Sequence, residues 1–168
     1  TNSGVQGYNI ILKTTSTFDL YTVTSLIAPP NGCRNNTQVW GTWSVNAQTF
    51  VANYPFPQNG VIFVEDHVWV EGKISSTRLT IASGRFPENS STNTSITVNK
   101  DLTYTQYDGT DVLGLIAQNN FNVGLRSNDV LTIDGALIAK NGRVGRFYYT
   151  SQCGSEYIRN SLTLHGAI

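Results

Sequence analysis

The side chains in this sequence that could take part in catalysis, metal binding or disulfide formation are a few carboxylates, two histidines and two cysteines. Asp108 and Asp111 lie in the segment YDGTD, where Gly109 permits a tight turn. Hard cations such as Ca²⁺ bind clustered oxygen ligands, so this pair is a candidate for part of a calcium loop. Two carboxylates are too few to complete such a site, and a plain turn is the favoured interpretation. We therefore expect no metal site and no cofactor.

A second cluster consists of Glu65, Asp66 and His67, three consecutive polar residues between two apolar runs. Together with an acid from another segment, they would provide the acid–base pair of a β-helical enzyme that cleaves polysaccharides. The alternative is a solvated corner with an exposed His67. Phosphate-binding loops, nucleophile elbows and HExxH motifs are absent from the sequence. The sequence thus favours a protein that is not an enzyme.

The two cysteines, Cys33 and Cys153, are far apart in the sequence, and neither belongs to a CxxC pair. Both histidines are distant from them, which argues against zinc. A disulfide is our first interpretation, and two buried free thiols are the alternative. A disulfide would place the protein in an oxidising compartment.

Ligand contacts are expected from aromatic and basic residues in predicted loops. Tyrosine rings can stack on sugars or bases, although core packing is the usual role of buried aromatics. Arginines can form a local patch for DNA, but the formal net charge is zero and only 13% of residues are charged, which argues against nucleic acid. The candidates are Tyr107, Tyr148, Tyr149, Arg143, Arg146 and Arg159.

These residues must be positioned by a series of short apolar runs, each followed by a polar corner. The last apolar residues before the corners are separated by steps of 16 to 19 residues and then by one of 31. Similarity at such a period predicts an all-β fold, a single-stranded β-solenoid with one coil per repeat. The residues before the corners are Val64, Ala82, Val98, Ala117, Ile133 and Leu164.

We expect a single domain in which residues 1–59 form an N-terminal β cap and 60–168 form the coils, with a long excursion at 143–160. In the cap, residues 8–24 predict two strands around a turn at 13–17, and 40–52 predict one or two more. Corner residues such as Asn99, Asn119 and Asp134 should be more exposed than the core. The residues expected to point inward in rows are Ile62, Val64, Ile81, Val98, Leu115, Ala117, Ile133, Leu137 and Leu164.

The repeated segments resemble the extracellular β-solenoid domain of PilX-like, type IV pilus-associated (pilin-like) proteins of candidate-phylum and related bacteria. The similarity covers roughly residues 7–168, and its most specific part is DGTDVLGLIAQNN. Further matching segments are GVIFVEDHVWVEG, RLTIASGRFP, LTIDGALIAKNGRVGRFYY and LTLHGAI. The resemblance implies a role at the cell surface or on a pilus, and it implies no catalytic residues.

Together these features predict a non-catalytic extracellular module with a structural or adhesive role, associated with pilus-like structures or filaments. The alternatives are a glycan-active β-helix enzyme and a DNA- or glycan-binding receptor at a pilus tip. No apolar run is long enough to span a membrane. The last segment, 162–168, resembles half of LTIDGALIA, so we expect an open edge there that binds another copy or another surface subunit.

Overall fold

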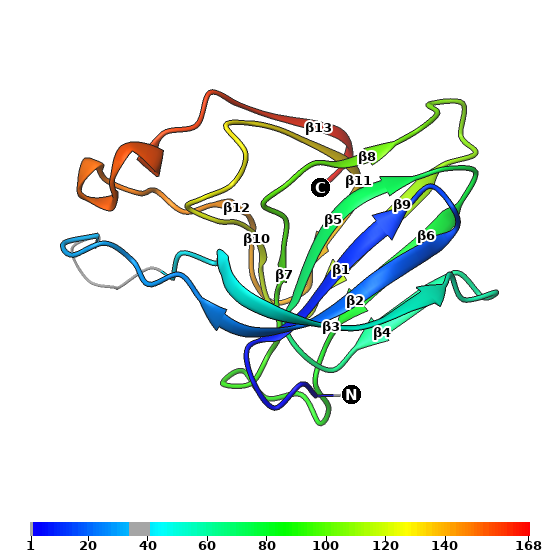
Figure 1. Cartoon of the computed structure of the whole chain (residues 1–168), viewed down its shortest axis with the longest axis horizontal. Coiled ribbons are helices and arrows are strands. Elements are labelled where there is room, and N and C mark those ends of the chain that lie inside the picture. The colour runs from blue at the N-terminus through cyan, green and yellow to red at the C-terminus, as the bar shows by residue number, and fades with distance from the viewer. Residues whose placement is uncertain (1, 34–40) are drawn as a thin grey trace.

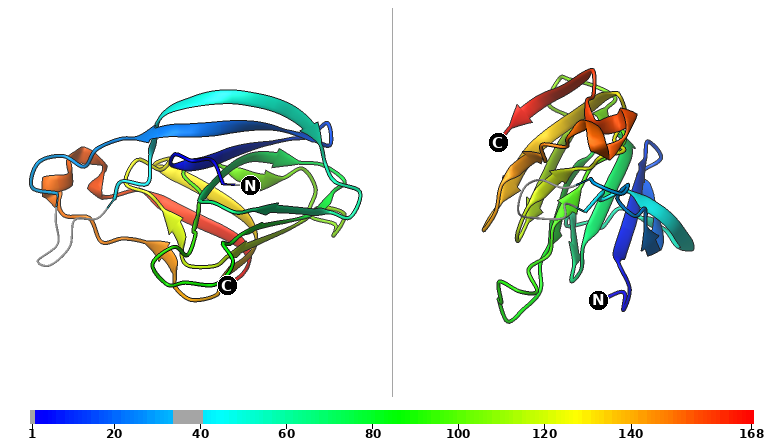
Figure 2. Two further views of the ribbon diagram at one scale, coloured as in Figure 1. Left: turned by 90° about the horizontal axis from the view of Figure 1, so that it is seen from below. Right: turned by 90° about the vertical axis from the view of Figure 1, so that its left-hand side faces the viewer.

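The computed structural model describes residues 2–33 and 41–168. Within these ranges the protein is all β, as the sequence predicts, and its ordered elements are strands and two short 3-10 turns. Thirteen strands form one sheet that curls round without closing (Figures 1 and 2). Trp40, the first residue of the strand region predicted at 40–52, lies outside the described residues.

The strands are mostly short. They are β1 (Gly7–Lys13), β2 (Thr17–Leu26), β3 (Val45–Pro55), β4 (Val61–Val64), β5 (Val68–Ile74), β6 (Arg78–Ser83), β7 (Ile96–Thr97), β8 (Leu102–Tyr104), β9 (Val112–Ala117), β10 (Phe121–Val123), β11 (Val130–Ala139), β12 (Val144–Arg146) and β13 (Ser161–Ala167). The 3-10 turns are η1 (Ser151–Cys153) and η2 (Ser155–Tyr157).

From β4 onward, strands pair in parallel and form three columns: β4–β6–β9–β11, β5–β7–β10–β12 and β5–β8–β11–β13. Buried apolar side chains align in register within each column, because neighbouring parallel strands present every second residue to the same face. In the first column, the aligned residues are Ile62, Ile81, Leu115 and Leu137. In the third, they are Leu102, Ile133 and Leu164.

The predicted equivalence of the pre-corner residues was therefore wrong for most steps. Only the last step, from Ile133 to Leu164, is a register pair. Val98 lies just after β7, in the second column, whereas Ala117 belongs to the first and pairs with Ala139. Strands in every column show the same alternation of apolar residues. The sequence pattern therefore cannot distinguish two strands of one column from two strands of different columns.

β11 changes its neighbour next to Gly135, because Val130–Ala136 pair with β13 and Ala136–Ala139 pair with β9. Gly135 has φ of +151°, and a Cβ there would lie 2.9 Å from the Leu113 carbonyl oxygen. Its register partner Gly166 has φ of +157°, and a Cβ there would overlap the Gly135 carbonyl oxygen. The Gly in each copy of the LTxxGA motif is thus required by a close approach of backbones.

The predicted core is largely confirmed. Eight of the nine residues expected to point inward are buried, and Leu164 in the outermost strand is half-buried. One corner prediction was wrong, because Asp134 is fully buried. Its carboxylate accepts hydrogen bonds from the Tyr104 backbone and the Tyr107 hydroxyl, which satisfies the charge away from water. Asn99 and Asn119 are half-buried.

The first three strands extend the same sheet. The predicted turn at 13–17 is confirmed, since β1 and β2 pair antiparallel with Lys13 opposite Thr17. β1 also pairs in parallel with β5, and β3 adds antiparallel to β2 (Figure 1). Inside the region predicted as an excursion, Val144–Arg146 forms β12 beside β10, so the irregular part is 147–160.

Candidate functional site

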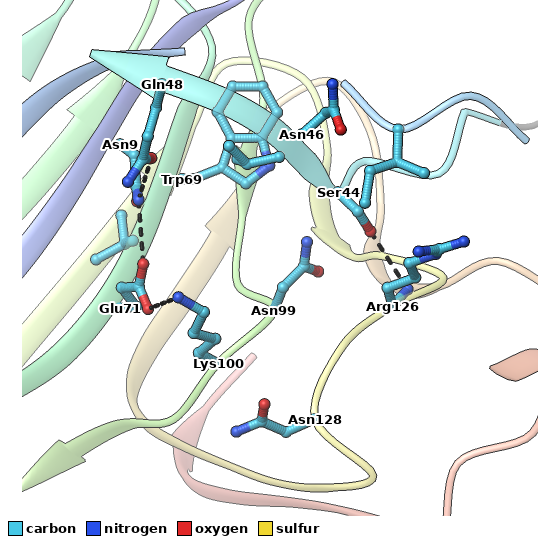
Figure 3. A pocket seen from close by; sticks show the side chains of 13 residues that line it. Asn9, Ser44, Asn46, Gln48, Trp69, Glu71, Asn99, Lys100, Arg126 and Asn128 are labelled. Atoms are coloured by element: carbon cyan, nitrogen blue, oxygen red, sulfur yellow. Dashed lines mark hydrogen bonds and ion pairs between the residues drawn. The ribbon is translucent and has the colours of Figure 1, made fainter. Parts of the chain in front are cut away.

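A groove of about 350 Å³, lined mostly by polar residues and called the polar groove below, is the candidate ligand site (Figure 3). It lies between β3, β5 and the loops that contain Asn99 and Asn128. Apolar side chains such as Ile27, Val45 and Trp69 form part of its wall. The polar residues that line it are Asn9, Ser44, Asn46, Gln48, Glu71, Asn99, Lys100, Arg126 and Asn128.

At one end of the groove, the alternation of side chains along β1 and β5 places three lining residues on the same face of the sheet. In the parallel pair of β1 and β5, Asn9 lies opposite Trp69 and two residues before the position opposite Glu71, so all three share one face. The Asn9 amide nitrogen donates to Gln48 Oε1 at 2.9 Å and to Glu71 Oε1 at 3.0 Å (Figure 3). Asn9 thereby joins β1, β3 and β5 beneath the groove.

The ionic groups of the groove are paired. Lys100 Nζ lies 2.8 Å from Glu71 Oε2, and Arg126 Nε lies 3.0 Å from Glu156 Oε2 outside the groove. Each cation therefore has a carboxylate beside it, and the local charge is balanced. The polar atoms that the groove presents to a ligand are therefore mainly neutral donors and acceptors.

Some of the polar groups already have structural roles. Asn99 donates to the Trp43 carbonyl and accepts from the Gly124 backbone, and Trp69 Nε1 donates to the same Trp43 carbonyl at 2.9 Å. Asn9 has such a role through its amide nitrogen, but the residue is only 4% exposed and its Oδ1 has no partner among the described residues. A buried acceptor without a partner is uncommon and costs stability.

The predicted disulfide is confirmed. Cys33 and Cys153 are joined and lie in a small separate cluster with Leu125 and Tyr149. Tyr149, a predicted ligand contact, is buried there, and its hydroxyl donates to the Gly41 carbonyl at 3.1 Å. Burial raises the pKa of Tyr149 to about 12. The structure thus places Tyr149 in a core that secures the 147–160 region.

The three predicted arginines do not form an outward basic patch. Arg146 donates to backbone carbonyls of Leu125 and Tyr157, and its guanidinium lies over the Tyr149 ring. Arg159 also donates to Leu125 and lies 3.2 Å from a Glu156 carboxylate oxygen. Arg143 is exposed and stacks over the ring of Phe147 at 4.0 Å. Two of the three guanidiniums therefore fasten loops.

The other two tyrosines are on the surface. Tyr148 is 81% exposed. Tyr107 is 65% exposed, but its hydroxyl donates to Asp134 Oδ2 at 2.8 Å, and this hydrogen bond raises the pKa of Tyr107. The other Asp134 oxygen lies 2.8 Å from His165 Nδ1. The buried carboxylate thus joins the loop between β8 and β9 to β13.

The candidate calcium carboxylates are used by hydrogen bonds within their own loop and, for Asp111, to Thr77. Asp108 accepts from the Thr110 backbone and hydroxyl, and these hydrogen bonds lower the pKa of Asp108. Asp111 is buried and accepts backbone hydrogen bonds from Thr77, Thr105 and Gln106. Within 2–33 and 41–168, no group of three or more His, Cys, Asp or Glu residues is arranged to hold a metal ion.

At the predicted acid–base corner, Asp66 is fully buried. Burial opposes its ionisation, but hydrogen bonds from Ser3 and the His67 backbone, together with the charge of Arg85, outweigh this effect and lower the pKa of Asp66. His67 is half-buried rather than exposed, and burial lowers its pKa. Its Nδ1 accepts from the Ser95 backbone. The corner therefore holds an ionised, fully bonded carboxylate.

The polar groove was not predicted from the sequence. Its members are scattered from Asn9 to Asn128 and form no motif, and polar residues that alternate with apolar ones in a strand are typical of ordinary solvated positions.

Among the described residues, no helix is long and apolar enough to cross a membrane. No protein-family model, no curated protein and no solved structure matches this chain.

Proposed function

We propose that this chain is a non-catalytic, extracellular module with an adhesive role, and that it holds its ligand in the polar groove. The observation that carries this proposal is the buried, unpartnered Oδ1 of Asn9 beside side-chain amides that line a concave surface. Concave sites with a few converging polar groups are where small ligands bind. A ligand donor would satisfy an acceptor that is costly to leave unpaired.

The frame around the groove is, in this proposal, a short β-solenoid. Three columns of parallel strands with aligned apolar residues support this interpretation. Stacked coils form a stiff scaffold, and a stiff scaffold lowers the entropy that binding costs. The Cys33–Cys153 disulfide supports an oxidising, extracellular setting.

Because the sequence resembles PilX-like domains, the proposal includes that the module is displayed on pilus-like structures or filaments. The edge of β13 would then bind another copy or another surface subunit. Among the described residues β13 pairs only with β11, and of its seven residues only Leu164 is not exposed. Unpaired strand edges are favourable sites for strand addition.

The arrangement of ionisable groups favours binding over catalysis. A glycan-active site needs a protonated acid near a second carboxylate, whereas Asp66 is ionised and engaged by Ser3 and Arg85. A DNA receptor needs cations that face outward, whereas Arg146 and Arg159 bind loop carbonyls. Both alternatives therefore rank below an adhesive module.

A retention assay on chitin, cellulose, mucin and collagen tests the proposal. We expect the protein to be retained on at least one of these surfaces, and the Asn46→Ala/Asn128→Ala double variant to be retained less. Thr49→Ala is the matched control, because Thr49 is an exposed residue of β3 that does not line the groove. Retention of the double variant equal to that of the control, or retention on none of the four surfaces, would rule the proposal out.

A further inference from the structure

We infer that the groove binds an uncharged sugar unit, a neutral hexose or N-acetylhexosamine within a glycan; the inference rests on the proposed function and specifies its ligand. The first reason is electrostatic. Glu71 is paired with Lys100 and Arg126 with Glu156. The charges of the groove are therefore balanced, so a charged ligand gains no net electrostatic attraction there, and exposed ion pairs of this kind contribute little by themselves.

The second reason is the hydrogen-bonding capacity at the Asn9 end. The amides of Asn9 and Gln48 lie side by side, joined by the 2.9 Å bond from Asn9 Nδ2 to Gln48 Oε1. This bond leaves an acceptor on Asn9, Oδ1, and the donor group of Gln48, Nε2. A hydroxyl both donates and accepts at one atom, so one sugar hydroxyl can serve both groups. A carboxylate or a peptide carbonyl cannot donate to Asn9.

Gln48 is the groove residue on β3 that is hydrogen-bonded to Asn9. The Asn9 oxygen is closed to solvent, whereas Gln48 is an exposed side chain on β3. In this inference the Gln48 side chain turns aside to admit the ligand, which costs the hydrogen bond from Asn9 Nδ2 to Gln48 Oε1, and a second sugar hydroxyl accepts from Asn9 Nδ2 in its place. Gln48 therefore acts as a movable cover that becomes a ligand contact.

The third reason is the apolar wall. Ile27, Val45 and Trp69 line the same groove as the amides. A pyranose ring presents C–H groups on its faces and hydroxyls at its edge, which matches a groove with one apolar side and one amide side. The volume of about 350 Å³ is at the small end of ligand sites, which suits one end of a saccharide rather than a long chain.

The test is a titration of the isotope-labelled protein, followed by two-dimensional NMR, with cellobiose, N,N′-diacetylchitobiose, digalacturonate and a soluble collagen peptide. We expect a neutral disaccharide to shift the amide signals of Asn9, Gln48 and Asn128, and digalacturonate to bind more weakly. Gln48→Ala and Asn128→Ala should each weaken binding by about tenfold, the usual effect of one lost hydrogen bond in a polar site. Thr49→Ala should bind as the wild type does.

The outcomes separate this inference from the proposed function. If the collagen peptide or digalacturonate shifts the groove signals and the neutral disaccharides do not, the groove is a binding site but the sugar assignment is wrong. If a neutral disaccharide binds but Gln48→Ala and Asn128→Ala bind it as tightly as Thr49→Ala, the saccharide is held elsewhere and the inference fails. If none of the four ligands shifts any groove signal and none of the adhesion surfaces retains the protein, both fail.

Discussion

Several polar residues stabilise this molecule through hydrogen bonds to distant segments, which their neighbours in the sequence do not predict. Asp66, Asp111 and Asp134 are buried carboxylates, and each binds backbone or side-chain donors from segments distant in the sequence. A buried charge is tolerated only when its lone pairs are satisfied. These residues therefore fix loops to the segments packed against them, which explains why clusters that first suggest metal or acid–base chemistry are bonded internally.

Asp66→Asn should destabilise the protein in a pH-dependent way. Because the pKa of Asp66 is lowered in the folded protein, its contribution is fully present above the ordinary aspartate pKa and is lost as pH falls through the lowered value. Loss of the charge-assisted bonds should reduce the free energy of unfolding by about 2–3 kcal/mol near neutral pH. Urea unfolding at neutral and at strongly acidic pH measures it.

The matched control is Asp108→Asn, since Asp108 is exposed and bonds only within its own turn. It should change stability less than Asp66→Asn does. The gap between wild type and Asp66→Asn should narrow on acidification. A gap that stays constant from neutral to strongly acidic pH would contradict the assigned ionisation of Asp66.

At the scale of the strand, alternation determines which side chains form the core. In β9, Leu115 is fully buried and is the register partner of Ile81 and Leu137, while the adjacent Ile116 is 37% exposed. Both residues are apolar and β9 is an interior strand of its column. The contribution of each residue to the free energy of unfolding therefore depends on its burial rather than on its residue type.

Leu115→Ala should lower the free energy of unfolding by about 2–5 kcal/mol, because it leaves a cavity in an aligned row. Ile116→Ala, the adjacent control, should cost less because much of its side chain remains in water. Thermal or denaturant unfolding of the two variants measures the difference. Equal destabilisation would mean that the inward face of β9 is misassigned.

At the scale of the whole molecule, the curled sheet ends in strands with free edges. β13 lies at one end of the third column, with Leu162 51% exposed and Ile168 81% exposed (Figure 2). At the opposite end of that column, β1, β2 and β3 extend the sheet. Beyond β1 and β2, β3 likewise pairs with a single strand among the described residues, β2, so the sheet has a free edge at that end too, and the association proposed at β13 concerns one of these two.

If copies associate through β13, light scattering should show a molecular mass that rises with protein concentration, and Leu162→Lys should reduce it to that of the monomer. A lysine on an edge strand blocks strand addition by charge and by its long side chain. Ile158→Lys is the control, because Ile158 is similarly exposed but lies outside the strand. A wild-type protein that stays monomeric throughout would refute the association.

The sequence alone was sufficient for the features that depend on local pattern. Alternating apolar residues identified the all-β class and most of the core, and Lys13–Thr17 was recognisable as a turn between two strands. The disulfide was predictable because the chain contains only two cysteines. These are properties of neighbouring residues or of composition, so no knowledge of packing is needed.

Only the tertiary structure decided which strands are neighbours, and with that the site. Val98 and Ala117 have the same local pattern but lie in different columns, and Asp134 is buried because Tyr107 and His165 reach it from other segments. The groove likewise depends on β1, β3 and β5 meeting in one register. Alternation is the same in every strand, so it does not specify which strands pair. The loops between the strands differ in length, and the pairing and its register are therefore selected by the packing of the whole core.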